Sequence, residues 1–153
     1  MLPVNIPSSI LHEAIAVLSG TFAPLNLPKS SSLILALLYT LGRPLDCIEI
    51  QQATGYSKSA VSAALRVLES HRLVHRVKRG RRSAYAPSHS LAKLLTEAHV
   101  RMLRSAREHL HEISKQIPKL NDNIARLDSE LSNAIRILEA GIRGAQSESG
   151  FKK

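Results

Sequence analysis

The sequence predicts a mainly α-helical fold with one small β-hairpin. Aromatic residues form only 3% of the 153 residues, so the hydrophobic share of 44% is largely aliphatic and suits packed helices. Between Pro44 and Pro87, two helical patterns joined by a short turn precede two extended segments around Gly80. Beyond residue 105, apolar residues recur in steps of four and three, as in a coiled coil. This order predicts an N-terminal helix, a winged helix-turn-helix domain and long C-terminal coiled-coil helices.

Residues 1–29 are expected to form an N-terminal arm and a helix that supports a dimer. Two prolines make residues 1–8 a loose arm, and Ser8 or Ser9 is placed to cap a helix that ends near Gly20. The apolar stripe of this helix comprises Ile10, Leu11, Ala14, Ile15 and Leu18. Residues 20–29, with one glycine and two prolines, read as a loop.

Residues 30–87 are predicted to form the winged helix-turn-helix domain. Its first helix is expected to start at one of the serines 30–32 and to end near Leu41, before Gly42 and Pro44. The expected buried face comprises Leu33, Ile34, Leu37, Leu38 and Leu41. Lys29 and the serines at the start of this helix have two interpretations, as ordinary caps or as phosphate contacts.

The second helix of this domain has a start signal in Asp46 and Glu49, which are spaced as a capping box. Ile48, Ile50 and Ala53 are expected on its apolar side. A glycine then suits a left-handed helix end, and residues 54–56 form the short turn of a helix-turn-helix.

The third helix, about Lys58 to His71, is the candidate recognition helix. Its buried face follows i, i+3, i+4 and i+7 spacing at Val61, Ala64, Leu65 and Leu68, with Ser57 as the N-cap. Small and hydroxylated side chains on the other side would allow close approach to base edges in the major groove. The alternative is the solvated side of an ordinary amphipathic helix. The candidate DNA-binding residues of this helix are Ser57, Lys58, Ser59, Ser62 and Arg66.

The β-hairpin from Leu73 to Ala86 carries five cations within seven residues. Five like charges on one small hairpin repel one another, and a phosphate backbone would neutralise them. A solvated charged loop and a nuclear localisation signal are the alternatives. The candidate DNA-binding residues of this wing are Arg76, Lys78, Arg79, Arg81, Arg82 and Tyr85.

The segment RPLDCIEIQQATGYSKSAVSAALRVLESHRLVHRVKRGRRSAYAP resembles the winged-helix core of the MarR superfamily. Within it, the segment is most similar to the choline-responsive repressors and their archaeal relatives. The pieces that match are GYSKSAVSAAL, LRVLESHRLV and the basic hairpin that ends in Tyr85. The resemblance covers about 45 of the 153 residues. It implies a winged-helix DNA-binding regulator in which an N-terminal helix joins the dimer interface.

The charge distribution agrees with a DNA footprint on this domain. The chain has a net charge of +9, and residues 58–87 carry eight Lys or Arg and one Glu, which is +7. Residues 88–153 carry +3 and residues 1–57 carry −1. A basic stretch of this kind binds phosphates and releases counterions.

Residues 88–143 are predicted to form a C-terminal coiled-coil dimerisation region, capped at Ser88 or Ser90. Pro118 interrupts it and leaves two interpretations open, a kinked continuous helix or a new helix that packs back as a hairpin. The unbroken heptad phase favours the first, and the sequence KLNDN after the proline favours a turn. Residues 144–153 are expected to be a disordered tail. The candidate dimerisation residues are Leu110, Ile113, Ile117, Leu120, Ile124, Leu127, Leu131 and Leu138.

The sequence predicts neither an enzyme nor a cofactor or metal site. It contains no phosphate-binding glycine loop and no nucleophile motif, and its seven histidines form no cluster with metal-ligand spacing. Cys47 is the only cysteine, so an intrachain disulfide is impossible, and a small buried residue in the first turn of a helix is favoured over a redox sensor. No secretory signal and no apolar run of about 18 residues is present. A cytoplasmic, nucleoid-associated protein is expected.

These observations predict a homodimer that binds double-stranded DNA in a sequence-specific manner as a transcriptional regulator. An architectural or partition protein with little sequence specificity is the alternative, and a winged helix used for protein interaction is a third interpretation. A small-molecule effector is expected from the resemblance but is unidentified. Because the five aromatic residues are scattered in the sequence, no aromatic cage for a choline-like cation is predicted.

Overall fold

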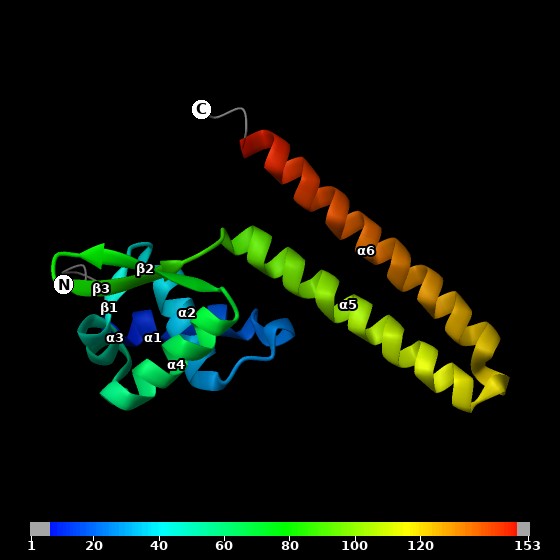
Figure 1. Ribbon diagram of the computed structural model, residues 1–153, viewed down its shortest axis with the longest axis horizontal. Coiled ribbons are helices and arrows are strands. Elements are labelled where there is room, and N and C mark those ends of the chain that lie inside the picture. The colour runs from blue at the N-terminus through cyan, green and yellow to red at the C-terminus, as the bar shows by residue number, and fades with distance from the viewer. Residues whose placement is uncertain (1–6, 150–153) are drawn as a thin grey trace. The chain divides into compact units, whose positions relative to one another are not determined.

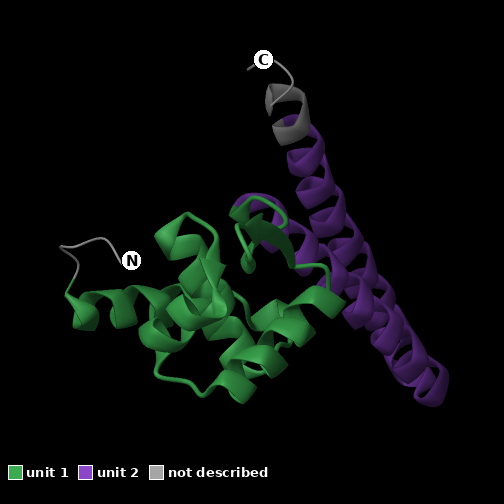
Figure 2. Cartoon of the chain, turned by 60° about the vertical axis from the view of Figure 1, so that its left-hand side comes forward, with its two compact units in different colours: residues 1–91 green, residues 92–153 purple. Residues whose placement is uncertain are grey.

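The computed structural model describes residues 7–149, which form two compact units that meet in the sequence between Leu91 and Ala92. Figure 2 colours the two units separately. The first is a winged helix-turn-helix domain, and the second is a pair of long antiparallel helices (Figure 1). The mainly α fold with a small sheet that the sequence predicts is therefore confirmed.

The first unit begins with α1 (Ser8–Gly20), a 3-10 turn (Ala23–Leu25) and α2 (Lys29–Leu41). The expected serine caps are wrong, because Pro7 and Pro28 occupy the N-cap positions of α1 and α2, and neither helix has a side-chain cap. Proline cannot donate a backbone hydrogen bond, so it fits a position where none is needed. Of the predicted apolar stripe of α1, Leu11 and Ile15 are buried within the single chain, whereas Ile10 is 55% exposed.

The centre of the first unit is α2, which packs against both α1 and α4 (Lys58–Ser70). Its residues from Ile34 to Leu38 are fully buried, a broader buried surface than the stripe that the sequence predicts. Phe22 is also buried, and its ring centroid lies 6.2 Å from that of Tyr39. These two aromatic residues are therefore not scattered in space, although Phe22, at 1% exposed, offers no surface to a ligand.

Two elements lie between α2 and the recognition helix. The capping box of α3 (Cys47–Thr54) is confirmed, with Asp46 at the N-cap and Glu49 at the third position. Ile50 and Ala53 are buried as predicted, whereas Ile48 is 45% exposed, so its predicted place on the buried side is wrong. A short strand, β1 (Leu45–Asp46), precedes α3 and pairs with β3.

The sheet therefore has three antiparallel strands in the order β1-β3-β2, one more than the predicted hairpin. The strands β2 (Val74–Arg79) and β3 (Arg82–Pro87) pair in a register that sets Val77 opposite Ala84 and Arg79 opposite Arg82. Gly80 has a φ of 62° in the tight turn, a conformation that glycine adopts without strain. The sequence did not predict β1 because two residues carry no detectable alternation.

The second unit is a helical hairpin of α5 (Leu91–Gln116), a 3-10 turn (Pro118–Leu120) and α6 (Asn121–Ser149). Pro118 therefore starts a turn, which is the second of the two interpretations of the sequence. The helices are joined by ion pairs from Arg104 to Glu139 and from Arg107 to Asp128. The predicted disordered tail is wrong up to residue 149, because α6 continues to Ser149, and residues 150–153 lie outside the described residues.

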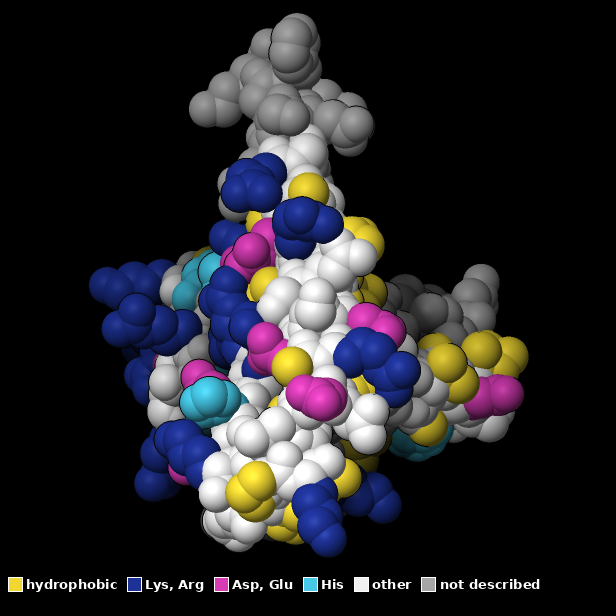
Figure 3. Space-filling view, turned by 90° about the vertical axis from the view of Figure 1, so that its right-hand side faces the viewer, with side chains coloured by type: hydrophobic (Ala, Val, Ile, Leu, Met, Phe, Trp, Pro, Cys, Tyr) yellow, Lys and Arg dark blue, Asp and Glu magenta, His cyan; other side chains and the backbone are white. Residues whose placement is uncertain are grey.

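The predicted coiled-coil seam is divided between the two helices of this hairpin. Only Ile124 among its members is buried, while Leu110, Leu131 and Leu138 are half-buried. The remaining members are between 39% and 47% exposed: Ile113, Ile117, Leu120 and Leu127. Charged side chains of both signs and hydrophobic side chains interleave over this unit in the space-filling view (Figure 3).

Candidate nucleic-acid interface

The recognition helix α4 is fixed at its start and along one side. The Ser57 hydroxyl accepts a hydrogen bond from the Ala60 N–H at 3.2 Å, which confirms the predicted N-cap. The predicted buried residues Val61, Ala64, Leu65 and Leu68 are all at most 3% exposed. The buried Ser31 of α2 donates its hydroxyl to the Ala64 carbonyl at 3.3 Å, so a polar contact adds to the apolar packing of these helices.

The turn before α4 has the conformation that its sequence requires. Gly55 ends α3 with a φ of 74°, in the left-handed region, and its N–H donates to the Gln51 carbonyl at 2.8 Å. The Thr54 hydroxyl accepts a hydrogen bond from the Tyr56 N–H at 3.2 Å. These contacts set the path of the chain from α3 into the recognition helix.

The opposite side of α4 is open to solvent. Ser57, Lys58, Ser59 and Arg66 are exposed and Ser62 is half-buried, so the structure brings the five candidates of this helix to one surface. In the part of the chain that the structure describes, no carboxylate pairs with Lys58 or Arg66. Their charges are therefore available to an external anion.

On the wing, Arg76 forms an ion pair with Glu69 of α4. Its guanidinium donates from Nε and Nη2 to the two carboxylate oxygens of Glu69, at 2.6 and 3.2 Å, and this hydrogen bonding raises the pKa of Arg76. The same guanidinium lies 5.7 Å from the centre of the Tyr85 ring. Tyr85 is only 7% exposed, so this candidate offers little surface for a DNA contact and instead supports Arg76.

Arg79 and Arg82 of the wing contact the capping box of α3. Arg79 Nη1 lies 3.1 Å from Glu49 Oε2 and 3.2 Å from the Pro44 carbonyl oxygen. Arg82 Nη1 lies 3.5 Å from Asp46 Oδ2. Sequence reasoning missed these contacts, because the paired residues are 30 and 36 positions apart. The capping-box pattern of Asp46 and Glu49 was the one signal in the sequence, and it placed two carboxylates together at the start of α3.

Glu49 is the centre of this network. Burial by itself would raise its pKa, but hydrogen bonds from the Asp46 N–H and from Arg43 outweigh burial and lower the pKa to about 2. The carboxylate is therefore fully ionised at neutral pH. The expectation that all five wing cations need an external anion is corrected, because three of them already pair with Glu49, Asp46 or Glu69.

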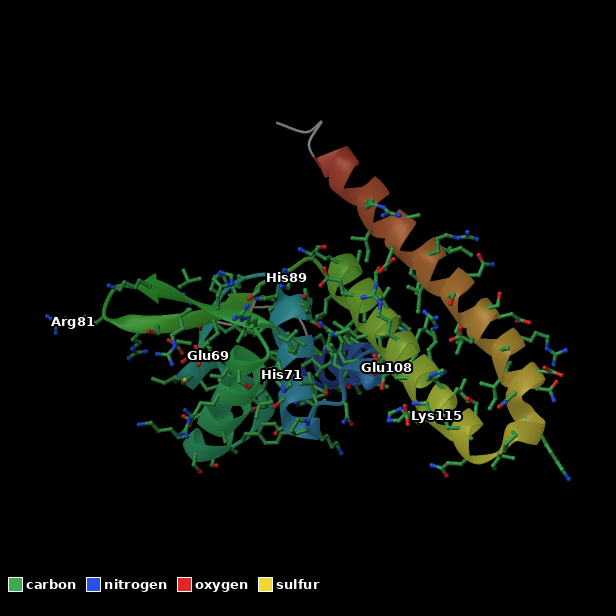
Figure 4. All side chains as sticks on the ribbon, turned by 45° about the vertical axis from the view of Figure 1, so that its right-hand side comes forward. Glu69, His71, Arg81, His89, Glu108 and Lys115 are labelled. Carbon is green, nitrogen blue, oxygen red and sulfur yellow. The ribbon has the colours of Figure 1, made fainter. Side chains whose placement is uncertain are left out.

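The other two wing cations, Lys78 and Arg81, are exposed. Within residues 7–149, no carboxylate lies within ion-pair distance of either. Arg81 follows Gly80 at the tip of the hairpin and points away from the domain (Figure 4). The wing therefore combines three paired cations near the sheet with two unpaired ones.

Cys47 lies at the first position of α3 and is half-buried. Burial, with a further contribution from the negative charge of Asp46, raises the pKa of its thiol. A raised pKa lowers the thiolate fraction and disfavours a redox role.

No group of three or more His, Cys, Asp or Glu residues in the described part of the chain is arranged to hold a metal ion. No helix within residues 7–149 is long and apolar enough to span a membrane.

Comparison with known proteins agrees with this geometry. The family model of the IclR helix-turn-helix domain matches residues 32–78, which include most of α2, all of β1, α3 and α4, and most of β2. A crystal structure described as that of a transcriptional regulator has a TM-score of 0.66 at 14% identity, and the match covers 91% of this chain and 99% of that chain. The chain carries a winged helix-turn-helix domain. No curated protein matches the chain in sequence.

Two further solved structures match the chain with lower TM-scores. MepR, a transcription regulator of a multidrug efflux pump of Staphylococcus aureus, has a TM-score of 0.45 at 21% identity, covering 80% of this chain and 93% of that chain. A MarR variant from E. coli has a TM-score of 0.44 at 16% identity, covering 87% of this chain and 99% of that chain.

Proposed function

We propose that the protein is a homodimeric transcriptional regulator that binds double-stranded DNA in a sequence-specific manner. The observation that carries this proposal is the recognition helix α4, which buries four apolar residues and presents a polar side with two unpaired cations. Only a short turn separates it from α3, and the basic wing follows it directly. As a DNA-bound regulator, the protein would act in the cytoplasm at the nucleoid.

In this proposal α4 enters the major groove. Ser59, Ser62 and Arg66 read base edges, and Ser57 and Lys58 lie near phosphate at the start of the helix. Arginine is suited to base readout because its planar fork can donate two parallel hydrogen bonds to guanine. The wing lies along the backbone or in the adjacent minor groove.

We infer that a second copy covers the exposed apolar side of the helical hairpin. The ion pairs of Arg107 with Asp128 and of Arg104 with Glu139 mark the sides of α5 and α6 that face each other. With 3.6 residues per turn, Met102 and Ile113 on α5 lie between about a third and a half of a turn from Arg104 and Arg107. Leu127 lies about a third of a turn from Asp128 and Glu139 on α6, so all three apolar side chains point away from the ion-paired seam.

Two such hairpins would bury their apolar sides against each other as a four-helix bundle, helped by α1. Two-fold symmetry then predicts a roughly palindromic site, with half-sites separated by about 10 bp or a multiple. Burial of Met102, Ile113 and Leu127 would stabilise the dimer, since each is more than 40% exposed in the single chain.

Selection from random duplexes followed by binding assays tests this proposal. The parent should enrich one motif, and Arg66→Ala should lose roughly 1–3 kcal/mol of discrimination at the bases it contacts. Arg126→Ala is the matched control, because it removes an exposed arginine of α6 in the hairpin. Equal binding of all sequences by the parent and by Arg66→Ala would contradict the placement of α4.

An architectural or partition protein is the second candidate function. The +7 charge of residues 58–87 favours it, since phosphate contacts by themselves give affinity without sequence preference. The same selection separates the two functions. A regulator enriches a motif, whereas an architectural protein binds well and enriches none.

A further inference from the structure

We propose that the wing cations divide into two groups with different roles in DNA binding. Arg79, together with Arg82, is a positioning residue that holds the wing onto the start of α3. Arg81, together with Lys78, contacts the phosphates. This inference rests on the proposed DNA-binding function and assigns roles within that site.

The positioning group is anchored to a carboxylate pair that has a second task. The Glu49 N–H donates to Asp46 Oδ1 and the Asp46 N–H donates to Glu49 Oε2, both at 2.9 Å, which caps α3. The Arg79 contact is to the same Oε2 atom of Glu49, at 3.1 Å. One pair of carboxylates therefore fixes both the first turn of α3 and the side of the wing that faces it.

Transfer of Arg79 from Glu49 to a DNA phosphate would be unfavourable. The side chain of Glu49 is 13% exposed and its pKa is lowered to about 2, so it would stay ionised with one cation fewer beside it. Arg43 would remain beside Glu49 at 2.9 Å, but this largely buried carboxylate would lose one of the cations paired with it. Arg82 is held less firmly, since it is 65% exposed and lies 3.5 Å from Asp46, and so the comparison rests on Arg79.

Arg81 differs from Arg79 although only Gly80 separates them. It is exposed at the tip of the turn and has no acidic partner among residues 7–149. It projects from the hairpin into solvent (Figure 4). A cation without a protein partner keeps its full charge for a phosphate and gains from counterion release.

The test is the salt dependence of binding to a duplex that carries the selected motif, with Arg81→Ala and Arg79→Ala as a matched pair. Each variant loses one arginine from the same turn. We expect Arg81→Ala to reduce the slope of log affinity against log salt by about 0.9, with an unchanged melting temperature. Arg79→Ala should lower the melting temperature and keep the parental slope. Equal slope losses in the two variants would overturn the division of roles.

Glu49→Gln gives a second test, in which the two explanations predict opposite signs. If Glu49 positions the wing through Arg79, binding should weaken severalfold without a steeper slope. If Glu49 only competes with phosphate for Arg79, binding should strengthen and the slope should rise by about 0.9, which would overturn the proposal. Should this variant fail to fold, the slopes of the arginine pair decide.

Failure of this inference is distinct from failure of the proposed function. A parent protein that binds no duplex near about 50 mM salt contradicts the DNA-binding function itself. A parent that binds with a steep salt slope, while Arg81→Ala keeps that slope, contradicts only the division of the wing cations.

Discussion

In the winged domain, five consecutive residues of α2 from Ile34 to Leu38 are fully buried, whereas α6 of the hairpin buries only Ile124 and Ile135 among its described side chains. Part of this difference is compositional, since eight of the 13 residues of α2 are apolar but only 11 of the 29 residues of α6. In the winged domain, α1 and α4 both pack against α2. Within the hairpin each helix has one neighbour, so a stripe of apolar residues stays exposed. The difference suggests that the first unit is complete by itself and that the second needs a partner.

The acidic side chains of the ion pairs are also less exposed in the winged domain than in the hairpin. In the winged domain, the side chain of Glu49 is 13% exposed and serves a helix cap and a wing arginine together. In the hairpin, the side chains of Arg107 and Asp128 are 37% and 41% exposed. Exposed ion pairs contribute little to stability because water and salt screen them. The charge network of the winged domain is therefore expected to matter for its stability, and that of the hairpin much less.

The largest effect should come from a cavity in the winged domain. We expect Leu38→Ala to destabilise this unit by about 3–4 kcal/mol, because a fully buried leucine is removed. All three tyrosines lie in this unit and the chain has no tryptophan, so tyrosine fluorescence during urea unfolding reports on it alone. Ile137→Ala, at a site that is 65% exposed, should change the stability of the hairpin by less than about 0.5 kcal/mol, which far-UV circular dichroism measures because it follows the helices of both units. Similar losses of unfolding free energy in Leu38→Ala and Ile137→Ala would contradict the difference in burial between the two units.

A charge on the apolar side of the hairpin should have the next largest effect. Leu127→Asp is expected to weaken the dimer about 100-fold, roughly 3 kcal/mol, because the carboxylate would be buried between two copies. Sedimentation over a concentration series measures this change. Ser129→Asp is the control, since Ser129 is exposed and lies almost half a turn from Leu127 on α6. A dimer that tolerates Leu127→Asp, or a protein that is monomeric throughout, would contradict the proposed interface.

Acid should destabilise the winged domain more than the hairpin. The pKa of Glu49 in the folded state, about 2, lies below its ordinary value of 4.5, so its contribution is fully present above pH 4.5 and is lost between pH 4.5 and 2. We expect Glu49→Gln to remove roughly 1–3 kcal/mol of stability at neutral pH and to flatten the acid limb. Urea unfolding at several pH values measures this. Glu130→Gln, at an exposed site of the hairpin, is the control for the loss of one carboxylate.

The smallest expected effect concerns backbone strain, which is confined to the winged domain. Both non-glycine residues with positive φ in the described part of the chain, Asn26 and Arg72, lie there. Arg72 has a φ of 56° just after α4, where glycine is preferred. Arg72→Gly should therefore stabilise the domain by about 0.5 kcal/mol, measured as a rise in melting temperature. Asn26→Gly should change stability less, because asparagine tolerates this conformation.

The sequence by itself determined the features that depend on neighbouring residues. The capping box at Asp46 and Glu49, the N-cap at Ser57, the buried side of α4 and the turn at Gly80 were all predicted and are confirmed. These features depend on hydrogen bonds and side-chain periodicity between residues that are close in the sequence, within one or two helical turns. The outward direction of the candidate residues on α4 follows from the same periodicity.

Only the tertiary structure decided the features that depend on distant residues. The strand β1 exists because Leu45 meets Tyr85, the hairpin at Pro118 exists because α5 and α6 pair, and Arg79 is neutralised because folding brings Glu49 to it. From the sequence, Arg79 and Arg81 were equivalent members of one basic run. Local rules cannot distinguish them, because an ion pair between residues 30 positions apart depends on how the whole domain folds.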